Sequence, residues 1–113
     1  MFLALPVILL GSQIVLAADR PPQFNIEPGC RAAATSAVAP NRTPDACKRD
    51  ENDARKKVES EWSQFKAADR DRCVRLSSLG GSPSYVELIT CLELAQAAAN
   101  LPPGDKLSGA LKP

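Results

Sequence analysis

The residues of this chain whose types could do chemistry are four cysteines, Cys30, Cys47, Cys73 and Cys91, and the chain contains no histidine. A cysteine nucleophile needs a base to form its thiolate, and histidine usually supplies that base. A zinc site made of four thiolates uses closely spaced ligand pairs, whereas 16, 25 and 17 residues separate these cysteines. The pattern therefore predicts structural disulfides, with no catalytic residue, no cofactor and no metal.

Charged residues are concentrated between positions 45 and 61, where carboxylates alternate with Lys and Arg. Several opposite charges are spaced four residues apart, as neighbours on a helix surface are: Glu51–Arg55, Asp53–Lys57, Arg55–Glu59 and Lys57–Glu61. This pattern is typical of a solvated helix face. It favours surface ion pairs over two carboxylates that perform general acid–base catalysis.

The pair Gly80-Gly81 precedes a predicted helix start and follows three arginines, Arg70, Arg72 and Arg75. A helix N-terminus with cations nearby can bind an anion. The same residues are also accounted for by a helix end, a tight turn and a serine cap, which the chain needs in any case. We therefore favour the structural interpretation.

Two further motifs also have a functional and a structural interpretation. Trp62 and Phe65 lie one helical turn apart and could line a ligand groove, but they more simply belong to the core. Asn41-Arg42-Thr43 has the form of an N-glycosylation sequon. Thr43 is equally explained as the N-cap of the helix that follows it.

The hydrophobic pattern predicts helices and no strand. Pro28 suits the first turn of a short helix, and Thr43-Pro44 starts a longer one. No Gly or Pro interrupts residues 45–79. Residues spaced three or four positions apart form one stripe on a helix face: Cys47, Glu51, Ala54, Val58, Trp62, Phe65, Asp69, Cys73 and Leu76. An unbroken helix would be too long for the domain, so we expect a break near 66–69 with Asp69 as an N-cap.

The helix expected over 84–100 should be central and the most buried. Ser84 and Glu87 have the spacing of a capping box. Residues 85–99 are apolar on almost every side apart from one polar stripe. The predicted fold class is all-α, a small disulfide-stapled helical hairpin assembly of about four helices.

Four cysteines allow three pairings. Cys73 lies six residues before the end of one predicted helix and Cys91 lies seven residues into the next, so the two sulfurs come level in an antiparallel hairpin. Cys30 and Cys47 flank the connection at 38–43 in a similar way. We predict the pairs Cys30–Cys47 and Cys73–Cys91.

Residues 1–18 contain no charged side chain and are dominated by Leu, Ile, Val and Ala. Val15 and Ala17 suit the −3 and −1 positions of signal-peptidase cleavage between Ala17 and Ala18. The alternative, an uncleaved membrane anchor, needs about 20 apolar residues. We therefore expect a signal peptide (1–17), an extended lead-in (18–27), a four-cysteine helical domain (28–101) and a disordered tail (102–113), with Phe24 and Ile26 available to dock.

The cysteine spacing occurs within a wider motif. It comprises Cys47-x-x-Asp50-Glu51-x-x-Ala54-Arg55, Trp62-x-x-Phe65-x-x-x-Asp69-Arg70-x-x-Cys73 and Ser84-Tyr85-Val86-Glu87-Leu88-Ile89-Thr90-Cys91-Leu92-Glu93. The motif resembles an uncharacterised group of small exported bacterial proteins with four cysteines. The resemblance covers roughly residues 28–101 and implies export and paired cysteines. It implies no substrate, cofactor or catalytic residue.

The net charge of +1, from 14 basic and 13 acidic residues, gives little support to nucleic acid or an anionic membrane as a partner. We therefore expect a periplasmic or secreted, non-enzymatic helical protein that binds a protein or envelope component, with no stable membrane anchor after cleavage. One alternative is a carrier of a small apolar ligand that uses Trp62, Phe65 and Tyr85. Another is a periplasmic acid-stress chaperone whose carboxylates would switch near pH 4. An enzyme is the weakest hypothesis.

Overall fold

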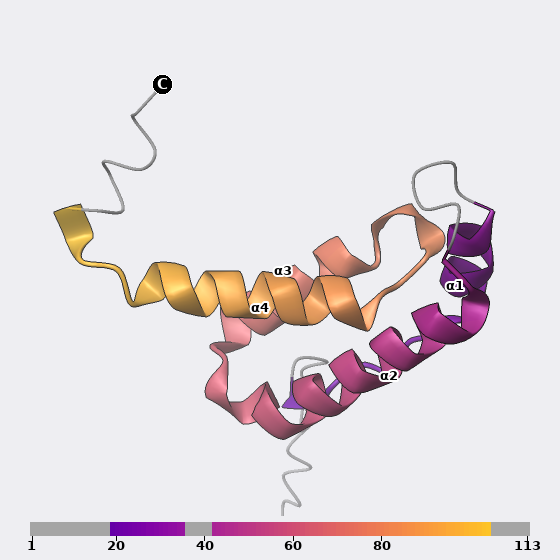
Figure 1. Ribbon diagram of the computed structural model, residues 1–113. Coiled ribbons are helices and arrows are strands. Elements are labelled where there is room, and N and C mark those ends of the chain that lie inside the picture. The colour runs from indigo at the N-terminus through magenta and orange to yellow at the C-terminus, as the bar shows by residue number, and fades with distance from the viewer. Residues whose placement is uncertain (1–18, 36–41, 105–113) are drawn as a thin grey trace, which may run out of the picture.

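The computed structural model describes residues 19–35 and 42–104, and within these ranges the fold is all-α (Figure 1). The helices are α1 (Glu27–Ala34), α2 (Pro44–Glu61), α3 (Ala67–Ser77) and α4 (Tyr85–Ala99), with short 3-10 turns η2 (Trp62–Gln64) and η3 (Leu79–Gly81). This confirms the predicted fold class. The predicted cleavage site at Ala17 and Ala18, Asn41 of the sequon and residues 105–113 of the predicted tail lie outside the described residues.

Helices α2 and α4 begin where their capping residues predict. The Thr43 hydroxyl accepts a hydrogen bond from the Ala46 N–H at 3.1 Å, and the Ser84 hydroxyl accepts one from the Glu87 N–H at 3.2 Å. Each bond satisfies a backbone donor that a helix start leaves without a partner. Pro28 lies in the first turn of α1, where its missing N–H costs no hydrogen bond.

Helix α4 is central, as expected, because it packs against both α2 and α3, while α1 packs on α2. Figure 1 shows α4 running beside α3, and α1 next to the start of α2. The turn between α3 and α4 depends on Gly80 and Gly81, whose φ angles are 82° and 77°. Glycine adopts such positive φ angles without the steric cost that a side chain would bring.

The break between α2 and α3 exists and includes Lys66 at the start of the predicted range, but it begins earlier, at Trp62, and the predicted cap is wrong. Helix α2 ends at Glu61, and Phe65 and Lys66 are extended before α3 begins at Ala67. The N-cap of α3 is Lys66, and Asp69 lies inside the first turn. The chain turns earlier than predicted because η2 and the extended Phe65 place Trp62 and Phe65 in the core before α3 runs back along α4.

The core forms where α2, α3 and α4 meet. Its buried members come from every one of these elements: Ala54, Val58, Trp62, Phe65, Cys73, Tyr85, Leu88, Ile89 and Leu92. The predicted stripe is buried from Cys47 to Phe65 and again at Cys73. Its predicted continuation to Leu76 is wrong, because the break at 62–66 resets the helical phase and leaves Leu76 49% exposed.

The lead-in packs against the helical domain. Phe24 and Ile26 contact the core, and the Phe24 ring lies 4.9 Å from that of Tyr85. The Tyr85 hydroxyl donates to the Pro22 carbonyl at 3.0 Å and accepts from the Phe24 N–H at 2.8 Å. The folded unit therefore includes residues 22–26 in addition to the helices.

Candidate interaction groove

The four cysteines are structural. Cys30 of α1 is bonded to Cys47 of α2, and Cys73 of α3 to Cys91 of α4, which is the predicted pairing. The Cα–Cα distances are 5.4 and 5.6 Å, within the normal range for a disulfide. No cysteine is free. A nucleophilic or metal-binding role would require a free thiolate, which these sulfurs do not provide while the bonds are intact.

The charged face of α2 makes fewer of the predicted pairs than its spacing suggests. Arg55 and Glu59 lie 3.9 Å apart, whereas Lys57 reaches Glu93 of α4 at 2.6 Å. Hydrogen bonding to Glu93 and its negative charge raise the pKa of Lys57 above the ordinary value of 10.5. Within the described ranges no group of three or more carboxylates and cysteines is arranged to hold a metal ion.

Glu51 has a role that the sequence analysis missed. It is only 7% exposed, and its carboxylate accepts hydrogen bonds from the Ser84 hydroxyl and the Tyr85 N–H, both at 2.6 Å. These donors lie at the start of α4, where the helix dipole favours a negative charge. The signal in the sequence was a carboxylate between the apolar residues Cys47 and Ala54 of the stripe, together with a serine cap elsewhere in the chain.

The aromatic residues form core, as the simpler interpretation predicted. Trp62, Phe65 and Tyr85 are 4%, 5% and 4% exposed and belong to one cluster. The Arg70 guanidinium lies 5.5 Å from the centre of the Trp62 ring. Arg72 is bonded to Asp69 at 2.9 Å. Two of the three arginines upstream of the Gly80-Gly81 turn are therefore already engaged in contacts of their own.

The sequence predicted that α4 would be the most buried helix, but one of its faces is open. Tyr85, Leu88, Ile89 and Leu92 are buried. Val86 is 39% exposed and Leu94 is 66% exposed. Among the described residues α4 packs mainly against α2 and α3, and the side of α4 turned away from them leaves Val86 and Leu94 partly exposed.

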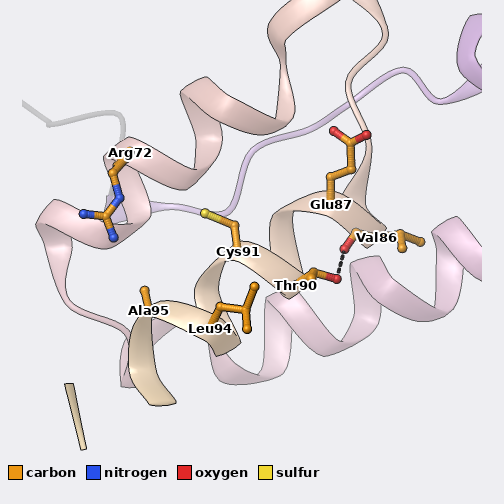
Figure 2. A pocket seen from close by; sticks show the side chains of 7 residues that line it. All are labelled: Arg72, Val86, Glu87, Thr90, Cys91, Leu94 and Ala95. Atoms are coloured by element: carbon orange, nitrogen blue, oxygen red, sulfur yellow. Dashed lines mark hydrogen bonds between the residues drawn. The ribbon is translucent and has the colours of Figure 1, made fainter. Parts of the chain in front are cut away.

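This open side forms a groove of about 570 Å³ between α3 and α4. Figure 2 shows its lining, which is Arg72 of α3 with Val86, Glu87, Thr90, Cys91, Leu94 and Ala95 of α4. The Thr90 hydroxyl donates to the Val86 carbonyl at 2.7 Å. Because that hydroxyl is satisfied by the backbone of its own helix, the surface along Val86, Thr90 and Leu94 is mainly apolar.

The two ends of the groove carry opposite charges. Arg72 lies at the end near Ala95, and Glu87 lies at the other end beside Val86 (Figure 2). Arg72 is 53% exposed at its side chain despite its bond to Asp69. The Glu87 carboxylate makes no ion pair with any residue in the described ranges. The site is therefore an apolar strip with a cation at one end and an anion at the other.

Three other large apolar side chains are exposed outside this lining: Leu76 of α3, Leu79 of the turn after it and Leu101 beyond α4. Leu76 follows Arg72 by one helical turn and extends the same side of α3. None of the helices described is long and apolar enough to cross a membrane.

Comparison with known proteins does not add a relative to these observations. No protein-family model, no curated protein and no solved structure matches this chain. The resemblance to small exported four-cysteine proteins stays a prediction.

Proposed function

We propose that this protein is an exported, non-enzymatic helical module that binds a protein or envelope component through the groove between α3 and α4. The observation behind the proposal is that Val86 and Leu94 are exposed two helical turns apart on the same face of α4 and line the same groove. A contiguous apolar surface on a small soluble domain is typical of an interaction site. The groove favours a protein partner with an apolar helical face, since such grooves commonly accept amphipathic helices.

The disulfides support the location and the rigidity that this function needs. Two intramolecular disulfides indicate an oxidising, extracellular-type compartment, and we propose the periplasm or the extracellular medium. The Cys73–Cys91 bond also joins the two helices that form the groove. A surface held rigid before binding loses less conformational entropy when a partner arrives.

The alternatives have less support from the residues. The hypothesis of a carrier relies on Trp62, Phe65 and Tyr85 to contact a small apolar ligand, but these rings pack in the core. For an acid-stress chaperone, Glu51 is the one carboxylate among the described residues that is buried. Its carboxylate accepts hydrogen bonds from Ser84 and Tyr85. These bonds are equally explained as contacts that stabilise the start of α4.

The proposal is tested by placing a photoreactive amino acid at Leu94 in the exported protein and irradiating the cells that make it. Lys56, which is exposed on α2, gives a matched control position. We expect covalent adducts at position 94 that are lost when Val86→Asp is added, and few adducts at position 56. Equal yields at the two positions, or adducts that persist with Val86→Asp, would refute the groove as a binding site.

A further inference from the structure

We infer that the partner of this groove is a second copy of the same chain, bound about a twofold axis with the two α4 helices antiparallel. The inference rests on the proposed function, because it names the partner of the same site. Two independent properties of the groove support it: the order of its apolar residues and the placement of its charges.

The row of side chains along the groove has an aliphatic residue at each end, so its pattern is similar in either direction along α4. Val86, Thr90 and Leu94 are spaced by four residues and so lie in one row along α4. A twofold axis near Thr90 places Val86 of one copy against Leu94 of the other, and the reverse contact follows from symmetry. An interface between identical subunits related by a twofold axis requires a surface that is complementary to itself in this way.

The charges are complementary under the same operation. Arg72 and Glu87 lie at opposite ends of the groove (Figure 2), so a twofold axis through its middle brings Arg72 of each copy to Glu87 of the other. The Glu87 carboxylate makes no ion pair with any residue of 19–35 and 42–104, and Arg72 keeps 53% of its side chain exposed beside its bond to Asp69. The contact between copies would therefore give Glu87 an ion pair that it does not make with these residues.

The expected dimer is weak. The groove occupies one side of a single helix pair. Two such surfaces would bury less than the roughly 1,600 Å² of total accessible surface that an interface of standard size buries. We expect reversible association at micromolar concentrations. Both disulfides are intramolecular, so the dimer forms without a covalent link between chains.

Sedimentation velocity of the oxidised protein over a range of concentrations tests the inference through a pair of charge reversals. Arg72→Glu alone places two carboxylates opposite each other at each end of the dimer. Glu87→Arg alone places two guanidinium groups opposite each other. Each variant should dimerise about tenfold more weakly than the parent protein. An equimolar mixture of the two variants should recover the parent affinity, because both contacts in the mixed dimer pair opposite charges. If Arg72 and Glu87 acted only within their own chain, mixing the two variants would not restore the affinity of the dimer.

A matched pair of leucine substitutions locates the interface. Leu94→Asp should abolish the dimer, whereas Leu79→Asp should leave it intact, since Leu79 is 69% exposed and lies outside the groove. Circular dichroism of each variant should match the parent protein, because both leucines are exposed.

Several outcomes would overturn the inference. They are a protein that stays monomeric up to about 1 mM, a dimer that Leu94→Asp and the charge reversals leave unchanged, and a groove whose Leu94 crosslinks to residues 105–113 of its own chain. A monomer whose Leu94 still crosslinks to a different protein would overturn the twofold dimer and leave the proposed function standing. A monomer without any adduct at Leu94 would overturn both.

Discussion

At the scale of single residues, the placement of Glu51 shows how a helix start can be completed by a side chain from another helix. Glu51 lies on α2, yet it accepts hydrogen bonds from two consecutive residues at the start of α4. The bonds join Glu51 to residues that are 33 and 34 positions further along the chain. Sequence patterns reveal the serine cap because its bond is local, but the contribution of Glu51 depends on how α2 and α4 pack.

We predict that Glu51→Ala lowers the free energy of unfolding by about 1–3 kcal/mol, because the Ser84 hydroxyl and the buried Tyr85 N–H lose their acceptor. Glu51→Gln should cost less, since its amide keeps one carbonyl oxygen. Glu59→Ala is the control and should change stability by no more than about 0.3–0.5 kcal/mol, as expected for an exposed helix pair. Urea unfolding of the three variants measures these differences. A loss as small for Glu51→Ala as for Glu59→Ala would contradict the assigned role.

Lys57 provides a second test at the residue scale. Its pKa is raised by Glu93, so the stabilisation that this pair contributes is fully present below pH 10.5 and is lost as the pH rises through the folded-state pKa. An NMR titration of the Lys57 side chain should give a pKa above 10.5 in the parent protein. The value should move back toward 10.5 in Glu93→Gln. A Lys57 pKa that is unaffected by Glu93→Gln would show that the ion pair does not persist in solution.

At the scale of elements, local signals located most helix ends and the apolar stripe of α2. Thr43, Ser84 and the two glycines act on backbone groups next to them, so their effects follow from the sequence alone. The position of the break after α2 does not, because it depends on where Trp62 and Phe65 meet the core. The open face of α4 was missed for a related reason. An apolar residue is buried only if another element is present to cover it.

The two faces of α4 should respond in opposite ways to the same substitution. Leu92 is fully buried, so Leu92→Asp should unfold the protein, since an unpaired buried carboxylate costs several kcal/mol. Leu94 is 66% exposed, and Leu94→Asp should leave the fold and its melting temperature nearly unchanged. Circular dichroism with thermal melting compares the two variants. A folded Leu92→Asp protein or an unfolded Leu94→Asp protein would contradict the orientation of α4.

The two disulfides connect different elements and should therefore differ in what they stabilise. Each should contribute about 3 kcal/mol. Replacing Cys73 and Cys91 with alanine should raise amide hydrogen exchange across α3 and α4, where the core lies. Replacing Cys30 and Cys47 should raise it mainly in α1 and at the start of α2. Faster exchange throughout the core in the second variant would show that α1 contributes more to the hairpin than its contacts indicate.

At the scale of the whole molecule, the fold class and the cysteine pairing were predictable because they depend on periodicity and on distance from a turn. The candidate site was not. Trp62 and Phe65, which the sequence pattern assigned to the core with a ligand groove as the alternative, do pack in the core. The groove consists of Val86, Leu94 and Ala95 with Thr90, Cys91, one arginine and one glutamate. These residues have no distinctive motif and become a site only because α2 and α3 leave one side of α4 uncovered.

The most direct test of the groove as an interaction surface is a scan of photoreactive substitutions along α4 in the exported protein, with the yield of covalent adducts measured at each position. We expect high yields at Val86, Thr90 and Leu94, which line the groove, and low yields at Glu93 and Gln96, which do not. The scan would detect a second copy of the chain as well as any other protein partner, because either one would form covalent adducts. A yield that is uniform along the helix, or highest at Glu93 and Gln96, would contradict the assignment of this face.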